Sequence, residues 1–317
     1  MLPSLISGIL GGYAHIGGVY CGQELKAICK QLNMSLGRAL TLQIVYELTA
    51  SCTSVVAKSF SGAAFHFRTM DWEMNYLKDL TVELEFKKGG KTVFVATSWA
   101  GYIGILTGMV PQKYSVSINF RRLGEAITKN VWAGMKGAWP VGFIVRECIS
   151  TCDSYQDFVE NMANTKLMAP TYVIVCGAKE GEGCQITRNR EGEVERKSLC
   201  DKDKPNFLLQ CNCDWFDKNP ETDILCSVAR RLTVTRILNE LYKVKEGVNE
   251  KDLWSLVSKY PVWNNETIYA TVMVPSLSRC KSIILEKDPN HAQNLGKQFE
   301  KDKEEIQSIL EKKSQLK

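Results

Sequence analysis

Two short strand-like runs, the first apolar and β-branched, are separated by a Ser-Gly turn and constrain this 317-residue chain more than any other feature. The first run, CTSVVAK, extends from Cys52 to Lys58, and the second, AAFHFRT, begins at Ala63. Phe60-Ser61-Gly62 supplies turn chemistry between them, so the segment is predicted to be a β-hairpin. Such a turn brings the end of the second strand opposite the start of the first. We therefore expect Arg68 and Asp71 to lie near Cys52.

A cysteine beside an arginine has two interpretations. A neighbouring guanidinium favours the thiolate, which is the nucleophilic form of the side chain. The more common arrangement is a buried structural cysteine next to a surface arginine. The pair alone leaves both interpretations open, and residues elsewhere in the chain have to decide between them.

The residues of the hairpin resemble a known nucleophile segment. Cys-Thr-Ser-Val-Val-Ala followed by Arg-Thr-Met-Asp is similar to the acid ceramidase and N-acylethanolamine acid amidase family, in the cysteine branch of the N-terminal nucleophile hydrolases, which is choloylglycine hydrolase-like. Arg68 and Asp71 follow Cys52 by 68 − 52 = 16 and 71 − 52 = 19 positions, the spacing of that family. The resemblance implies self-cleavage between Ser51 and Cys52, so that the uncut chain is a zymogen.

Two further segments resemble those that lie beside the substrate pocket in this family. The run WAGYIGILTGM begins at Trp99 and is similar to the family's Phe-Ala-Gly-Tyr-x-Gly-x-Leu-Thr-Gly, which implies that Trp99 and Tyr102 contact substrate. A packed glycine-rich turn is the alternative. Asn119-Phe120-Arg121 stands where the family has Asn-Glu-Arg, so Asn119 and Phe120 are also expected at the pocket. Phe120 cannot ionise, and we expect an optimum closer to neutral pH than an active-centre glutamate would set.

Two later residues complete the expected site. Asn212 takes the place of the family's oxyanion asparagine, and Arg230 matches an arginine that helps to shape the active site. An asparagine at a strand end is otherwise a turn former, and an arginine pair at a helix start is otherwise merely solvated. The resemblance assigns Cys52 as nucleophile, its α-amine as general base, Asp71 as the group that holds the amine, and Arg68 as the stabiliser of the thiolate.

These assignments imply an amidohydrolase of N-acylated lipids that forms a Cys52 thioester and releases a fatty acid and an amine. A non-catalytic lipid-binding module of the same fold and a hydrolase of bile-salt or penicillin amides remain alternatives. A papain-like protease would need His66 as a partner, but its position between Phe65 and Phe67 is typical of a hydrogen-bonded strand residue.

The order of the expected elements gives the fold class. Helices come first, then strands, helices and strands again, which indicates an α+β protein. The resemblance implies an αββα four-layer sandwich. We expect a helical pro-segment at residues 1–51, a catalytic chain at 52–285 and a charged helical tail at 286–317. Gln23 to Asn33 is predicted as one helix, and Ser35 is predicted to N-cap a second that runs into the nucleophile.

Composition limits the partners. A net charge of +5 from 40 basic and 35 acidic residues, spread along the chain, does not indicate nucleic-acid binding. The 12 cysteines and 3 histidines have no metal-ligand spacing, so we expect neither a metal nor another cofactor. Reduced thiols fit at least as well as disulfides. The resemblance implies a heterodimer of the two self-cleaved chains.

The N-terminal segment bears on location. Met1 to Leu10 has apolar residues at helical spacing, and it either packs on the core or contacts a membrane surface. It lacks the basic region of a signal peptide. The resembled enzymes are lysosomal and carry a signal sequence, so this chain is expected to be either truncated or not secreted. Lysosomal and cytoplasmic locations are both left open.

Overall fold

The computed structural model describes residues 20–44, 50–123, 127–201, 203, 205–214 and 226–284. The expected helix at Met1 to Leu10 and the charged tail from Glu286 lie outside these residues, as do residues 45–49 just before the nucleophile. Among the described residues, two helices precede the first strand: α2 (Gly22–Gln31) and α3 (Leu36–Gln43). Both were predicted, and the Ser35 side chain caps α3 as expected by accepting a hydrogen bond from the backbone N–H of Arg38. However, α3 ends at Gln43 and does not continue to the nucleophile as one helix.

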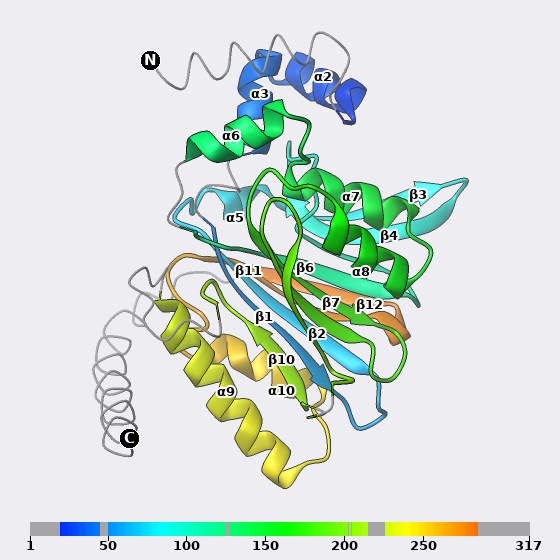
Figure 1. Ribbon diagram of the computed structural model, residues 1–317, viewed down its shortest axis with the longest axis vertical. Helices are drawn as coiled ribbons and strands as arrows, with labels where there is room; N and C mark the ends of the chain where they lie inside the picture. The colour runs from blue at the N-terminus through cyan, green and yellow to red at the C-terminus, as the bar shows by residue number, and fades with distance from the viewer. Residues whose placement is uncertain are drawn as a thin grey trace.

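Two antiparallel sheets form the centre of the molecule (Figure 1). The five-stranded sheet has the order β10-β1-β2-β11-β12, and the seven-stranded sheet runs from β3 to β9 in sequence order. The first sheet consists of β1 (Ser51–Lys58), β2 (Ala64–Asp71), β10 (Phe207–Gln210), β11 (Thr267–Val274) and β12 (Arg279–Ile284). The second consists of β3 (Thr81–Lys88), β4 (Lys91–Trp99), β5 (Thr107–Val110), β6 (Tyr114–Phe120), β7 (Thr171–Gly177), β8 (Gly183–Arg188) and β9 (Glu193–Ser198).

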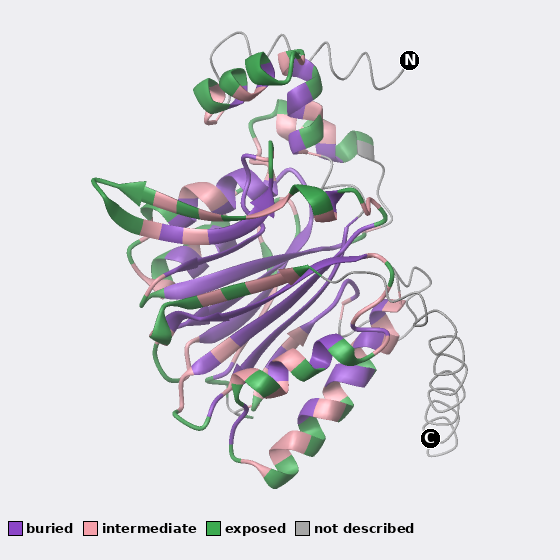
Figure 2. Ribbon diagram, turned by 180° about the vertical axis from the view of Figure 1, so that it is seen from behind, coloured by how far each residue is buried: buried purple, intermediate pink, exposed green. Residues whose placement is uncertain are grey.

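Helices cover the outer faces of both sheets, which gives the expected αββα arrangement of an α+β protein (Figure 1). The seven-stranded sheet is covered by α7 (Val141–Thr151) and α8 (Tyr155–Asn164), and the five-stranded sheet by α9 (Ser227–Val244) and α10 (Glu250–Ser255). Shorter elements are α5 (Leu77–Leu80), η2 (Leu256–Ser258) and η3 (Pro275–Leu277), and α6 (Ile127–Met135) lies between β6 and α7 in the sequence. Figure 2 shows that buried residues concentrate in the strands between these helical layers.

The predicted elements do not include β5, α6 and α10, nor the short α5, η2 and η3. The short strand β5 lies in the glycine-rich run, where pairing with β4 and β6 on both sides holds an extended backbone that glycine does not favour by itself. The helix α6 was not expected at all. A capping box between Asn249 and Asp252 starts α10, a local signal that the sequence does contain.

The β1–β2 hairpin forms as predicted and brings Arg68 and Asp71 near Cys52. Ser51 pairs with Asp71 and Cys52 with Met70, so the two ends of the hairpin meet at the nucleophile. Side chains alternate across a strand. Cys52 therefore belongs to the apolar core that also contains residues of β4 to β8 between the sheets, whereas Val55 packs in the cluster that contains residues of α9 and α10. Ser51 shares the α9-facing side of β1 with Val55.

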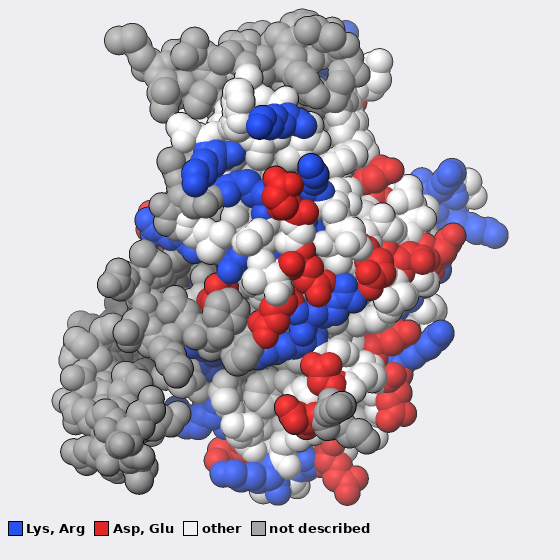
Figure 3. Space-filling view, viewed as in Figure 1, with Lys and Arg blue, Asp and Glu red and all other residues white. Residues whose placement is uncertain are grey.

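Charged side chains are mixed over the surface. On the face seen in Figure 3, lysines and arginines are interspersed with aspartates and glutamates over the described part of the chain. In the ranges that the structure describes, no helix is long and apolar enough to cross a membrane.

Candidate active site

The thiol of Cys52 lies between the two sheets, fully buried, and contacts the guanidinium of Arg68. The Nη2 of Arg68 donates to the Sγ of Cys52 over 3.0 Å, while its Nη1 donates to the carbonyl oxygen of Leu106 and to the Oγ1 of Thr107. Nη2 also donates to the Sδ of Met70 over 3.2 Å, so two contacts on each nitrogen fix the plane of the guanidinium. A positive charge held against the sulfur favours the thiolate, the form that attacks a carbonyl.

Aromatic side chains form a wall beside this pair. The hydroxyls of Thr107 and Tyr269 lie 2.9 Å apart, and the Arg68 guanidinium lies 5.7 Å from the centre of the Tyr269 ring. The Trp99 ring contacts Tyr269 at 6.1 Å and Tyr102 at 5.8 Å between ring centres. The two aromatic residues expected at the pocket are thus joined to the nucleophile through Tyr269. Sequence reasoning missed Thr107, although it lies in the Leu-Thr-Gly of the glycine-rich motif, and Tyr269, for which the strand pattern carries no signal.

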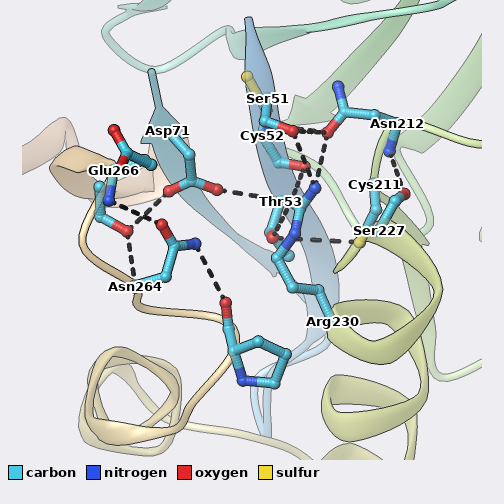
Figure 4. Close-up of polar contacts among 12 residues, drawn as sticks. Ser51, Cys52, Thr53, Asp71, Cys211, Asn212, Ser227, Arg230, Asn264 and Glu266 are labelled. Carbon is cyan, nitrogen blue, oxygen red and sulfur yellow. Dashed lines mark hydrogen bonds and ion pairs between the residues drawn. The ribbon is translucent and has the colours of Figure 1, made fainter. Parts of the chain in front are cut away.

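Asn212 and Arg230 hold the backbone of Cys52 (Figure 4). The N–H of Cys52 donates to the Oδ1 of Asn212 over 2.7 Å, and the Nη1 of Arg230 donates to the carbonyl oxygen of Cys52 over 2.5 Å. The Nη2 of Arg230 also donates to the same Oδ1 over 2.9 Å. These two residues, far from Cys52 in sequence, therefore fix the peptide unit on both sides of the nucleophile's Cα.

The amide group of Asn212 is oriented by its own partners. Its Nδ2 donates to the carbonyl oxygen of Phe120 over 2.8 Å, and its backbone N–H donates to the Oγ of Ser227, the first residue of α9, over 2.7 Å. In this uncut chain the oxygen of the side chain faces the Cys52 nitrogen. The role of Asn212 as an oxyanion donor stays a prediction.

Asp71 is fully buried opposite Ser51 in the hairpin. Its Oδ1 accepts a hydrogen bond from the hydroxyl of Thr267 over 2.8 Å, and its Oδ2 lies 3.5 Å from the Nη1 of Arg230. Burial raises the pKa of Asp71 to about 6, although the positive charge of Arg230 acts in the opposite direction. A carboxyl with that pKa can exchange a proton near neutral pH. Its expected contact with the freed amine stays a prediction.

Asn119 and Phe120 lie at the end of β6, next to the nucleophile. The Nδ2 of Asn119 donates to the carbonyl oxygen of Gln210 over 2.8 Å and approaches that of Cys52 at 3.5 Å, while its Oδ1 accepts from the Ser54 hydroxyl. Phe120 is 8% exposed and packs in the core between the sheets. Asn119 thus ties β6 to β1 and β10, and contact of either residue with substrate stays a prediction.

His66 lies fully buried on the same face of β2 as Arg68. Its Nδ1 and Nε2 are hydrogen-bonded to the hydroxyls of Ser115 and Ser117, at 2.9 and 2.8 Å. Burial, and then the charge of Arg68, lowers its pKa to about 3, so the ring is neutral. Both ring nitrogens are engaged with the opposite sheet, which supports a structural role and not that of a protease base.

None of the 12 cysteines, all of which lie in the described part of the chain, forms a disulfide. Cys211 and Cys213, on either side of Asn212, are both buried. Within the same residues, no group of three or more histidine, cysteine, aspartate and glutamate side chains is arranged to hold a metal ion.

The chain is similar in sequence to a family of amide hydrolases and to two named enzymes. A model of the linear amide C–N hydrolases, choloylglycine hydrolase family, matches residues 52–195 and so begins at Cys52. The chain is 33% identical over 251 residues to the N-acylethanolamine-hydrolyzing acid amidase of Rattus norvegicus, covering 79% of this chain and 67% of that protein. It is 34% identical over 289 residues to the acid ceramidase of Heterocephalus glaber, covering 86% of this chain and 69% of that protein.

A solved structure shares the fold. The N-acylethanolamine-hydrolyzing acid amidase ortholog of Caenorhabditis elegans superposes with a TM-score of 0.65 at 32% sequence identity. The match covers 74% of this chain and 100% of that chain.

Proposed function

Because this chain belongs to the linear amide C–N hydrolases of the choloylglycine hydrolase family, we propose that it cleaves N-acylated lipids of the ceramide or N-acylethanolamine type into a fatty acid and an amine. Family membership makes it a hydrolase of linear amide carbon–nitrogen bonds. The lipid substrate is supported by the two relatives, whose names are acid ceramidase and N-acylethanolamine-hydrolyzing acid amidase. The observation that carries the proposal is the buried Cys52 thiol, 3.0 Å from the Arg68 guanidinium.

Activity would require the Ser51–Cys52 bond to be cut first. The Cys52 nitrogen is an amide in the uncut chain and has no basic lone pair, whereas the cut chain has an α-amine at the same place, where it can take the thiol proton. Asn212, already 2.7 Å from this nitrogen, would hold the amine, and Asp71 would supply a nearby negative charge once ionised. The cut protein would be a heterodimer of residues 1–51 and the chain that starts at Cys52.

Turnover then follows with the residues in place. The Cys52 sulfur attacks the substrate's amide carbonyl, Arg68 stabilises the negative charge on sulfur, and the amine passes the thiol proton to the leaving nitrogen. The carbon–nitrogen bond breaks and a Cys52 thioester remains. Water, deprotonated by the same amine, attacks the thioester, releases the fatty acid and restores the thiol. Aromatic side chains such as Trp99 and Tyr102 offer apolar surface for an acyl chain.

Intact-mass measurement of the purified protein between about pH 4 and 8 tests the first step, since this interval brackets the groups expected to titrate. We expect two chains separated at Ser51–Cys52 and a single chain for Cys52→Ala. A Cys52→Ala chain that still splits at Ser51 would show that another protease makes the cut. A wild-type chain that stays whole would favour a binding module.

A panel of acyl amides tests the substrate. Ceramide and N-acylethanolamines are compared with bile-salt and penicillin amides, using cut wild-type protein, with Cys52→Ala as the inactive control. We expect release of fatty acid from the lipid amides. Preferential release from bile-salt or penicillin amides would leave the amidase in place and overturn the lipid assignment.

A further inference from the structure

We infer that the hydroxyl of Ser51 positions the bond that the protein cuts in itself. The inference rests on the proposed self-cleavage. It concerns a residue whose side chain lies on the opposite face of β1 from the Cys52 thiol. Ser51 precedes the nucleophile, is fully buried, and faces α9 and not the space between the sheets. It would act on the cleavage step by fixing the orientation of its own carbonyl group.

Asn212 and Arg230, both in the described part of the chain, hold the side chain of Ser51 (Figure 4). Its Oγ donates to the Oδ1 of Asn212 over 3.1 Å and accepts from the Nη2 of Arg230 over 3.1 Å. These are the two residues that bind the backbone N–H and carbonyl of Cys52. One pair of side chains therefore holds the residue before the cut through its hydroxyl and the residue after the cut through its backbone.

The geometry of β1 places contacts on both sides of the Ser51–Cys52 peptide bond. Alternate side chains of β1 point to opposite faces, so the Cys52 thiol faces Arg68 between the sheets while the Ser51 hydroxyl faces Arg230 on the other side. The peptide bond between them is fixed from both faces of the sheet. Rotation of residue 51, which would swing its carbonyl carbon away from the sulfur, would break the contacts of the hydroxyl with Asn212 and Arg230.

The step that benefits is an acyl shift from nitrogen to sulfur. The Cys52 sulfur attacks the carbonyl carbon of Ser51, a carbon–sulfur bond forms, and the bond from that carbon to the Cys52 nitrogen breaks. The thiol proton ends on the nitrogen, which becomes the α-amine. Water then hydrolyses the thioester, leaving a carboxylate on Ser51 and restoring the thiol. Removing the Ser51 hydroxyl takes one acceptor from the buried Arg230 and releases the carbonyl from its fixed orientation.

The test compares the rates of self-cleavage of Ser51→Ala, Ser51→Thr and wild type by intact mass after purification under conditions that delay the cut. We expect Ser51→Ala to cut on the order of tenfold more slowly, the effect of one lost hydrogen bond to a charged group. Ser51→Thr keeps the hydroxyl and should recover most of the rate. Ser98→Ala is the matched control, because it removes a buried hydroxyl that has no hydrogen-bond partner among the described residues. It should cut like wild type.

Hydroxylamine separates the two steps of cleavage, because it attacks a thioester but leaves an amide. If Ser51 assists the acyl shift, Ser51→Ala should stay about tenfold slower than wild type in hydroxylamine as well. Restoration of the wild-type rate would place the defect in thioester hydrolysis and overturn the inference. Thermal melting of Ser51→Ala in the Cys52→Ala background detects a loss of folding.

The remaining outcomes are distinct. Cleavage of Ser51→Ala at the wild-type rate, or of Ser51→Thr as slowly as Ser51→Ala, overturns the inference alone. A wild-type chain that never cuts overturns the proposed function and this inference with it.

Discussion

At the scale of single residues, the buried carboxyl of Asp71 links function to stability. Its pKa of about 6 lies above the usual value of 3.8, so the folded chain binds this proton more tightly than the unfolded chain does. The free energy of unfolding should therefore fall as pH rises from about 4 to about 6, by about 3 kcal/mol, and stay lower at neutral pH. The ionised form of Asp71, which the proposed mechanism needs, therefore lowers the stability of the folded chain.

Asp71→Asn tests this relation. In the Cys52→Ala background, which keeps the chain whole, we expect Asp71→Asn to be at least as stable as its parent at pH 7 and to lose the fall between about pH 4 and 6. Urea unfolding at several pH values measures the stability at pH 7 and its change between about pH 4 and 6. In the active background the same change should remove most turnover. A clear loss of stability at pH 7 would show that the ion pair with Arg230 outweighs the cost of burial.

Arg68 is expected to act through its geometry as well as its charge. Lysine keeps the charge but cannot contact Cys52, Leu106 and Thr107 together, as the arginine fork does. We expect Arg68→Lys to lower kcat/KM on the order of hundredfold and Arg68→Ala to lower it further, with little added effect when Asp71 is also changed. Steady-state kinetics on fully cut protein measure this. Near-normal turnover of Arg68→Ala would remove its assigned role.

Phe120 bears on the pH dependence. Turnover that needs ionised Asp71 should rise through about pH 6 and persist near pH 7, because no carboxylic acid stands at position 120 to require acid. Phe120→Glu should shift the profile toward acid. The measurement is kcat/KM from about pH 4 to 8. A wild-type profile confined below about pH 5.5, or an unchanged profile in the variant, would show that another group sets the pH dependence.

At the scale of elements, an ion pair fixes the segment that carries Asn212. Arg121, just after β6, donates from Nε and Nη2 to the two carboxylate oxygens of Asp214 over 2.8 and 2.6 Å, and Tyr172 of β7 donates to the same carboxylate. The two charged side chains are only 5% and 15% exposed. The pair thereby ties the end of β10 to the seven-stranded sheet, two residues from Asn212.

Arg121→Ala should destabilise the protein by about 3 kcal/mol, because it leaves a largely buried carboxylate without its partner. It should also slow turnover by loosening Asn212. Changing Asp214 to alanine as well should cost less than the sum of the two single changes. The exposed pair Lys113–Asp153, 42% and 94% exposed, is the control, and Lys113→Ala should change stability by less than about 1 kcal/mol. If Arg121→Ala and Lys113→Ala lowered stability by the same amount, the stabilising role assigned to the Arg121–Asp214 pair would be wrong.

At the scale of the whole molecule, α2 and α3 are held to the rest of the chain by packing. Leu25 of α2 and Leu40 of α3 are buried against Ile103 and Phe143. The Gln43 side chain donates to the carbonyl oxygen of Gly101 and accepts from the N–H of Ile103, at 2.9 and 2.7 Å. These contacts do not depend on the Ser51–Cys52 bond.

We therefore expect residues 1–51 to stay bound after the cut. Cut protein should elute as one species in size-exclusion chromatography and separate into two chains only in denaturant. Leu40→Ala should weaken this association because it leaves a cavity, whereas Glu24→Ala, which breaks a more exposed ion pair with Arg146, should change it little. Separation of the wild-type chains without denaturant would exclude a stable heterodimer.

Local patterns in the sequence determined much of the fold. Apolar runs on either side of a Ser-Gly turn predicted the β1–β2 hairpin, and the Ser35 cap predicted the start of α3. Register followed from the Ser-Gly turn, which places Arg68 and Asp71 at the same end of the hairpin as Cys52. These features depend on neighbours in the chain and on the period of two in a strand.

Only the tertiary structure decided the surroundings of the nucleophile. Ser51 contacts Asn212 and Arg230 across 161 and 179 positions, and Thr107 contacts Tyr269 across 162, so no local period connects them. Packing of β1 between the second sheet and α9 selects which distant side chains reach each face. The resemblance identified Asn212 and Arg230 as site residues. The orientation of the Asn212 amide and the hydroxyl contacts of Ser51 arise from that packing, because buried polar groups form hydrogen bonds with the side chains of the layer packed against them.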